Sequence, residues 1–132
     1  MLVLLPLPSR CPEEVLPADP WTVFSARESL DLACGPASLS WAGKYAAKLA
    51  VIELLGLTEP VWSDVEILPD EADCRAPGGP CRARHRPSVV LSGAARTAAG
   101  GARGGRIAVT ITHETTAAAA LVVWDRTATA PV

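Results

Sequence analysis

The sequence predicts a single α+β domain. Its 132 residues suffice for one core of ordinary size, and 49% of them are apolar against 20% charged, a composition typical of folded chains. A long stretch with helical periodicity lies among short apolar runs that suit strands, and no linker separates them. Residues 1–132 are therefore expected to form one unit, a long helix packed on an antiparallel sheet, with a frayed tail at 126–132.

The N-terminal part is expected to contain one strand and little other regular structure. An apolar run at 2–7 suits a strand, and Pro6 confines its end to a sheet edge or a bulge. Three prolines make 11–20 a connection, and a short helical or irregular piece should follow at about 21–32.

The clearest element is a helix over 37–55. Ser38 is expected to cap its start and Gly56 to end it. Lys44 and Lys48 lie one turn apart and share a face. One buried stripe is expected, formed by the apolar residues that recur at helical spacing: Ala42, Tyr45, Ala46, Leu49 and Ile52.

The second half should supply the remaining strands. Its expected elements, in order, are a strand at 61–68, a loop over 69–88 with a short strand at 81–85, a small-residue helix at 88–99, and strands at 106–112 and 118–124.

Composition excludes several classes of protein. A net charge of -2 gives no reason to expect a nucleic-acid binder, and no apolar stretch is long enough to span a membrane. The first ten residues lack the basic region and the cleavage site of a signal peptide, so a cytoplasmic protein is expected. Four cysteines are then expected to be reduced, and Cys74, Cys81 and His85 lack the spacing of a zinc site.

Several motifs point to one family. Residues 41–56, WAGKYAAKLAVIELLG, follow the pattern L-A-G-R-F-A-A-K-E-A-x-x-K-A-x-G, where x is hydrophobic. Residues 109–114, VTITHE, follow the pattern S-[IL]-[ST]-H-[TE] and precede an alanine-rich run at 117–123. Residues 62–66, WSDVE, fit a D-[IV]-E strand between these two segments, and Gly79 with Pro80 fits a G-x-P turn. Over 22–124 the chain therefore resembles the holo-acyl-carrier-protein synthases, the compact phosphopantetheinyl transferases.

The resemblance implies a fold, an activity and partners. It implies the 4'-phosphopantetheinyl transferase fold, and transfer of the phosphopantetheine arm from coenzyme A (CoA) to a serine of an acyl carrier protein. It also implies a homotrimer with its active sites between subunits. In this family a magnesium ion at the CoA pyrophosphate is held by an aspartate ending the first strand and by the glutamate of the K-E pair.

The chain departs from the family at both magnesium ligands. Leu49 stands where the family has its helix glutamate, and the position of the first-strand aspartate falls on or near Pro6. A hydrocarbon cannot coordinate magnesium, which takes oxygen ligands, so magnesium-dependent transfer is expected to be impaired. Glu53, where the family has a lysine, lies one turn after Leu49 and could hold a displaced metal, act as an acid or base, or simply be solvated.

The other predicted site residues follow from the matched motifs. Lys44, Lys48 and His113 are the expected ligand-binding residues for CoA phosphates, and no protein ligand for a metal is assigned. His113, Glu53, Lys48 and Glu114 are the expected catalytic residues, with His113 as acid or base. The alternatives are two exposed lysines on a helix and a histidine with only a structural role.

Three functions remain open at this stage. The leading hypothesis is metal-independent chemistry on an acyl or polyketide chain bound to CoA or a carrier protein, in secondary metabolism. The second is an active holo-acyl-carrier-protein synthase with a rebuilt metal site. The third is a non-catalytic partner of a carrier protein that uses the basic residues around Arg82 and Arg84.

Overall fold

The computed structural model describes residues 1–8, 11–33, 40–69, 86–101, 105–114 and 116–126. Their elements, in chain order, are β1 (Leu2–Pro6), α1 (Pro12–Val15), α2 (Pro20–Val23), α3 (Ala26–Ala33), α4 (Ser40–Leu55), the 3-10 turn η1 (Trp62–Asp64), β2 (Val65–Pro69), β3 (Pro87–Leu91), α5 (Gly93–Ala98), β4 (Arg106–His113) and β5 (Ala117–Asp125).

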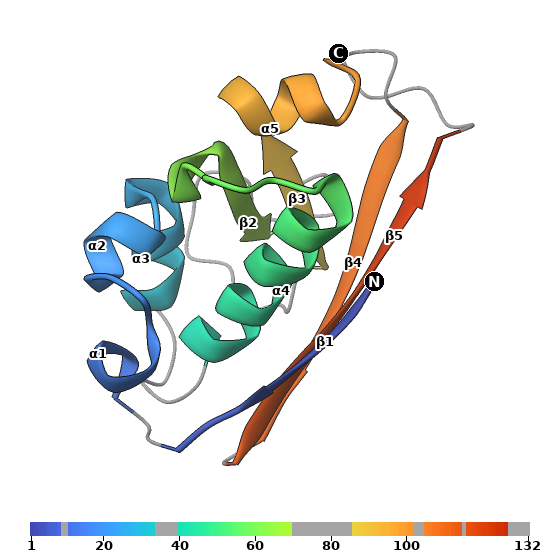
Figure 1. Cartoon of the computed structure of the whole chain (residues 1–132). Helices are drawn as coiled ribbons and strands as arrows, with labels where there is room; N and C mark the ends of the chain where they lie inside the picture. The colour runs from blue at the N-terminus through green and yellow to red at the C-terminus, as the bar shows by residue number, and fades with distance from the viewer. Residues whose placement is uncertain (9–10, 34–39, 70–85, 102–104, 115, 127–132) are drawn as a thin grey trace, which may run out of the picture.

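Two antiparallel sheets enclose one long helix. The larger sheet has the strand order β1-β5-β4, and the smaller one pairs β2 with β3. Figure 1 shows α4 lying across the larger sheet, with β2, α2 and α3 on the other side of the helix. This arrangement confirms the predicted α+β fold, in which a long helix packs on an antiparallel sheet.

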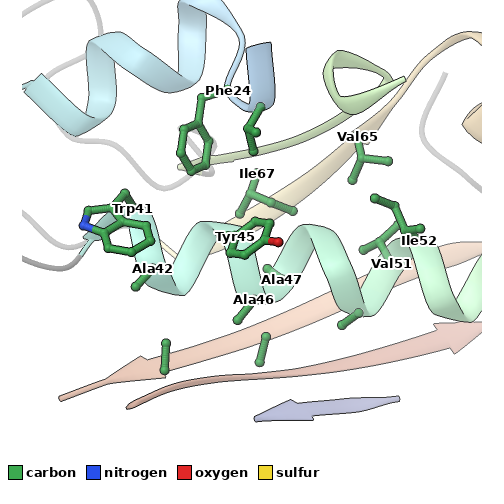
Figure 2. Close-up of a cluster of buried hydrophobic side chains, with 14 of the residues drawn as sticks. Phe24, Trp41, Ala42, Tyr45, Ala46, Ala47, Val51, Ile52, Val65 and Ile67 are labelled. Atoms are coloured by element: carbon green, nitrogen blue, oxygen red, sulfur yellow. The ribbon is translucent and has the colours of Figure 1, made fainter. Parts of the chain in front are cut away.

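The helix α4 is buried on every side, whereas we predicted a single buried stripe of apolar residues. Each residue from 41 to 48 is buried, including Lys44 and Lys48, so the two lysines share a face but not an exposed one. The reason is that two layers cover the helix, whereas the stripe assumed one layer. Figure 2 shows Trp41 and Tyr45 on the side of Phe24 and Ile67, while Ala42 and Ala46 face the larger sheet.

The end of α4 follows the prediction. Gly56 has φ +67°, Leu57 N donates to Ile52 O at 3.1 Å, and Gly56 N donates to Glu53 O at 3.1 Å. These bonds form a Schellman motif, in which a left-handed glycine satisfies the last carbonyls. The predicted residues 37–39, including the Ser38 cap, lie outside the described residues.

The segment after 86 corrects a prediction. We expected one helix over 88–99, but 88–91 belong to β3 and only Gly93–Ala98 is helical. Val89 and Val90 pair with β2 at Ile67 and Glu66, where branched side chains fit an antiparallel ladder better than a helix. Gly93, with φ +53°, then turns the chain into α5.

Other differences are smaller. The predicted strand at 61–68 begins with η1, and only its second part is β2. The predicted connection at 11–20 contains α1 and the start of α2, each with a proline in its first turn, where the missing N–H costs nothing. The described residues do not include the predicted short strand at 81–85. They also do not include six side chains considered in the sequence analysis: Cys34, Cys74, Cys81, Arg82, Arg84 and His85.

Gly93 allows the stability of the turn before α5 to be tested. Alanine at 93 would adopt an unfavourable φ and place its Cβ 2.5 Å from Asp64 Oδ2. Gly93→Ala should therefore lower the free energy of unfolding by more than the ~1–2 kcal/mol of a left-handed residue alone. Gly56→Ala is the matched control, because its φ of +67° is similar and no atom lies within 4 Å of its Cβ. Equal losses in urea unfolding would contradict the contact with Asp64.

Candidate functional site

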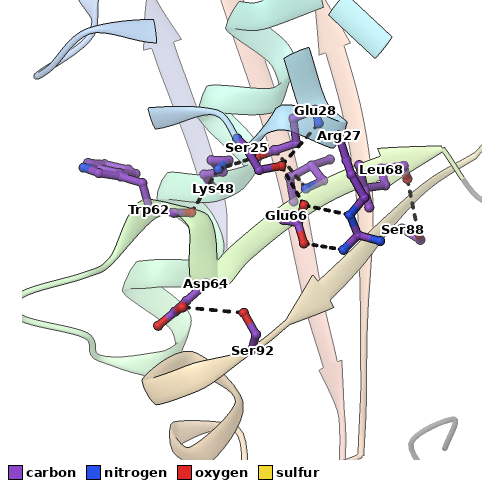
Figure 3. Close-up of polar contacts among 11 residues, drawn as sticks. Ser25, Arg27, Glu28, Lys48, Trp62, Asp64, Glu66, Leu68, Ser88 and Ser92 are labelled. Carbon is purple, nitrogen blue, oxygen red and sulfur yellow. Dashed lines mark hydrogen bonds and ion pairs between the residues drawn. The ribbon is translucent and has the colours of Figure 1, made fainter. Parts of the chain in front are cut away.

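A buried polar network joins α2, α3, α4 and β2 (Figure 3). It begins with a capping box: Ser25 N donates to Glu28 Oε1 at 3.0 Å, and Glu28 N donates to Ser25 Oγ at 3.2 Å. Such reciprocal bonds satisfy two donors at a helix start. The local sequence therefore begins α3 at Ala26 and directs the Glu28 carboxylate inward.

Lys48 and Glu28 form an ion pair with no exposed surface. Lys48 Nζ lies 2.6 Å from Glu28 Oε1 and also donates to Val23 O at 2.6 Å and Trp62 O at 3.0 Å. Glu28 Oε2 accepts from Ile67 N at 3.0 Å. The three ammonium protons and both carboxylate oxygens are therefore used, which is the condition for tolerating a buried ion pair. Burial lowers the pKa of the Lys48 ammonium, while the bond and charge of Glu28 act in the opposite direction.

Glu66 extends the network toward the surface. Its carboxylate accepts from Ser25 Oγ at 2.6 Å and is paired with the guanidinium of Arg27. The bond from Arg27 holds the pKa of the Glu66 carboxyl below its usual value, and Ser25 acts in the same direction against burial. Arg27 is itself mostly exposed, so this pair lies at the edge of the core.

The structure gives Lys48 and Lys44 positions inside the protein. Lys48 holds the end of α2, η1 and α3 against α4, and it would have to leave three partners to meet a phosphate. Lys44 is 8% exposed and donates to Ile67 O at 2.8 Å on β2. In the single chain, neither ammonium faces the solvent where a ligand could bind it. Two other arrangements were expected from the sequence, lysines that bind phosphates and lysines that are merely exposed, and the structure shows neither.

His113 lies at a different place, at the exposed end of β4. The close approach of α4 to β4 at Gly43 brings it there: a Cβ on Gly43 would lie 2.5 Å from Ile111 Cγ2 and 3.6 Å from His113 Cδ2. Without a side chain at 43, the imidazole can lie against the helix while keeping its ring exposed. Glu114 follows in the turn, exposed, with its backbone N donating to Ala117 O at 2.8 Å.

Glu53 is not close to His113 in one chain. It is exposed in the last turn of α4, ten residues after Gly43, or about 15 Å along the helix. The predicted catalytic residues therefore fall into three places: Lys48 in the core, His113 with Glu114 at the end of β4, and Glu53 at the far end of α4.

The residues at the family's magnesium position do not fit that ion. Leu49 is a half-buried hydrocarbon, and the end of β1 offers Pro6 and Leu7, neither of which has a side-chain oxygen. Glu53 is a single carboxylate, and within the described part of the chain no three His, Cys, Asp or Glu side chains gather as a metal site. Magnesium needs several oxygen ligands, and these residues do not supply them.

Comparisons with known proteins identify the fold. No protein-family model matches the chain, and neither does any curated protein sequence. A solved ACPS–CoA complex from Chronobacterium ammoniagenes is 21% identical with a TM-score of 0.64, covering 95% of this chain and 96% of that one. The apo-ACPS of that organism is 22% identical with a TM-score of 0.65, covering 92% and 90%. The acyl carrier protein synthase of Mycobacterium tuberculosis is 25% identical with a TM-score of 0.62, covering 94% and 93%.

The chain has the fold of the acyl carrier protein synthases. This likeness confirms the fold that the resemblance of the motifs implied. Among the described helices, none is both long and apolar enough to cross a membrane.

Sequence reasoning missed the residues of the buried network. Glu28 looks like an ordinary surface acid in the sequence and was not singled out. Glu66 was noted only as the glutamate of the D-[IV]-E motif, and not as a partner of Arg27 and Ser25. A signal for Glu28 existed, because Ser25 and Glu28 have the S-x-x-E spacing of a capping box before an apolar helix. The D-[IV]-E motif places Glu66 on a strand, but no local signal identifies its partners Ser25 and Arg27, which lie about 40 residues earlier in the chain.

The ion pair predicts strong coupling between Lys48 and Glu28. Lys48→Met or Glu28→Gln alone should lower the free energy of unfolding by about 3–5 kcal/mol, because each leaves a buried group without its partner. The double variant should lose much less than the sum of the two. Urea unfolding of all four proteins gives the coupling energy. Additive losses would show that the pair has no net interaction.

The lowered pKa of Glu66 predicts that the protein loses stability at acid pH. A carboxyl group whose folded pKa lies below its unfolded value stabilises the protein above the unfolded pKa, and this contribution is lost as the pH falls through the folded pKa. Since the ordinary value is 4.5, the loss should occur below that pH. Glu66→Gln should lower the free energy of unfolding at neutral pH and should make that free energy fall less steeply as the pH drops below 4.5. The exposed control Glu59→Gln should leave this pH dependence unchanged. If urea unfolding gave the same dependence of stability on pH below 4.5 for Glu66→Gln and for the unaltered protein, Glu66 would not be the group responsible.

Proposed function

We propose that the chain binds the phosphopantetheine arm of CoA or of a carrier protein and acts on the attached acyl or polyketide chain without a metal. The observation that carries this proposal is Leu49: a hydrocarbon occupies the family's magnesium-ligand position within a fold that is kept over nearly the whole chain. Secondary metabolism is the proposed setting, suggested by the Ala, Arg and Pro bias typical of GC-rich genomes.

The choice of ligand rests on the fold neighbours. One of them is described as an ACPS–CoA complex, and its fold extends over 95% of this chain. Fold alone does not determine activity, because function resides in the site. For this chain, the proposed ligand is therefore the pantetheine arm that CoA and a holo-carrier protein share.

His113 is the proposed acid–base residue. It is exposed beside Gly43, and an imidazole can exchange a proton near neutral pH. Glu114 is the adjacent exposed carboxylate that could orient it. Lys48 is less suited to this role than we expected, because its protons are already used in the core.

We also propose that the protein is a homotrimer. The face of the larger sheet that points away from α4 carries large apolar side chains that are 47–71% exposed: Leu2, Leu4, Leu121 and Val123. Leu2 lies directly opposite Leu121 across the β1–β5 ladder. An apolar area of this kind marks an interaction surface. Association would also allow Glu53 of one copy to approach His113 of another.

An active synthase is the second candidate, favoured by one observation. Glu53 is an exposed carboxylate one turn from Leu49, and with the CoA phosphates it could hold a displaced magnesium ion. Lysine stands at this position in the family, so the same change also adds negative charge beside the proposed phosphate site. A non-catalytic partner of a carrier protein is the third outcome.

Two measurements on one preparation test the proposal. An apo carrier protein is incubated with CoA, magnesium and this protein, and intact-mass spectrometry follows any gain of one phosphopantetheine. Calorimetry measures binding of CoA with magnesium and with a chelator. We expect no mass gain, and CoA binding that the chelator does not change. A known acyl carrier protein synthase is the positive control for transfer.

The outcomes separate the three candidates. Mass gain that Glu53→Ala abolishes would establish the rebuilt magnesium site and reject the proposal. Failure to bind both CoA and a holo-carrier protein would also reject it. Binding without any change to an acyl chain, and without an effect of His113→Ala on that chain, would leave the non-catalytic partner.

A further inference from the structure

The indole nitrogen of Trp41 differs from the other buried polar groups. Trp41 lies in the first turn of α4 and is 7% exposed. Within the residues that the structure describes, its Nε1 is the only buried side-chain nitrogen or oxygen without a hydrogen-bond partner. The buried Lys48 and Glu28, by contrast, have partners for all their donors and acceptors. A buried donor without a partner is uncommon and costs free energy, so its presence calls for an explanation.

Packing of the core does not require this donor. Figure 2 shows the indole ring of Trp41 on the side of Phe24 and Ile67, with its nitrogen on the part of the ring that points away from both. The carbon atoms of the ring therefore make the apolar contacts, and a leucine or phenylalanine could make such contacts too. Leucine stands at this position in the family pattern that residues 41–56 follow, so the N–H is a property of this chain and not of that pattern.

Neither water nor an anion is a good partner for the indole N–H. A buried water typically makes about three hydrogen bonds to groups that are otherwise unsatisfied. In the described part of the chain, no second buried side-chain donor or acceptor lacks a partner and could share such a water. One neutral N–H also does not offset the cost of removing an anion from water. The better match is a mostly apolar ligand that carries a neutral acceptor oxygen.

The position of Trp41 connects it with the proposed site. His113 lies against the same turn of α4, because a Cβ on Gly43 would be 3.6 Å from His113 Cδ2. Gly43 follows Trp41 by two residues, which is about 3 Å along the helix axis. The imidazole is exposed and the indole N–H is buried. The start of α4 therefore has one polar group at the surface and another at greater depth.

We propose that Trp41 Nε1 donates a hydrogen bond to a keto or hydroxyl oxygen of the acyl chain, and thereby selects oxygenated chains over saturated ones. This inference rests on the proposed function and names the class of acyl chain that the site takes. The thioester end of the chain would lie near the exposed His113, and the inner part would reach Trp41. An oxygen on the chain satisfies the buried donor, whereas a saturated chain leaves it unpaired.

Paired ligands test the selection. Calorimetry measures the binding of acyl-CoA pairs that differ in one oxygen: acetoacetyl-CoA with butyryl-CoA, and β-oxo-octanoyl-CoA with octanoyl-CoA. The unaltered protein should bind the oxo member of a pair about fivefold or more tightly than the saturated member. Trp41→Phe removes the N–H and keeps an aromatic ring, so it should lose this preference. Trp21→Phe is the matched control, because Trp21 is 76% exposed, and it should keep the preference.

A second measurement does not depend on the folding of Trp41→Phe. The chain has four tryptophans, so NMR of the unaltered protein gives one indole N–H signal for each. Phenylalanine variants of Trp21, Trp62 and Trp124 identify the other three signals. The Trp41 proton should move downfield with an oxo-acyl-CoA and not with its saturated partner, because a hydrogen bond deshields the proton.

The outcomes distinguish this inference from the proposed function. Equal affinities within both pairs would overturn the inference. A preference that Trp41→Phe retains, or a Trp41 proton that does not respond to the oxo ligand, would overturn it as well. If CoA and the saturated acyl-CoAs bind without any preference for oxygen, the inference fails and the proposed function stands. If neither CoA nor any acyl-CoA binds, both fail.

Discussion

The buried pair of Glu28 and Lys48 is the interaction on which the other parts of the core depend. Removing two charges from water costs several kcal/mol for each ion, and Coulomb attraction alone does not reliably offset that cost. Here the cost is met by complete hydrogen bonding: the ammonium has three acceptors, and the carboxylate takes backbone donors from Ser25 and Ile67. The end of α2, the start of α3, η1, β2 and α4 all meet at this pair, so their relative positions are coupled.

Burial of α4 limits where function can reside. A helix covered on all sides cannot offer the polar groups of its middle turns to a ligand, and Lys44 and Lys48 are used to bond β2, α2, α3 and η1. What remains exposed is Glu53 in the last turn and the strand-end residues His113 and Glu114. A rigid scaffold with reactive groups at the ends of its elements is a common way to build a site.

Leu49 occupies a position on α4 where the fold does not require a particular side chain. The backbone path, the alanine-lined contact between α4 and the larger sheet, and the buried ion pair do not require a carboxylate at 49. Leu49 packs against the core, and a hydrocarbon, unlike a carboxylate, cannot coordinate a cation. Stability therefore does not require a carboxylate at 49, and the fold neighbours reveal the scaffold rather than the chemistry.

The sequence by itself determined the fold class, the helix ending at Gly56, the strands near both ends and the family resemblance, because these depend on local periodicity, caps and motifs. It assigned 88–91 to a helix since small residues surround Val89 and Val90, whereas pairing with β2 decided for a strand. It also identified Lys48 as a site residue, yet could not place it. Only the tertiary structure decided that this lysine is buried against Glu28 and that His113 and Glu53 lie apart. Burial and distance arise from contacts between segments far apart in the chain, and such contacts leave no local pattern in the sequence.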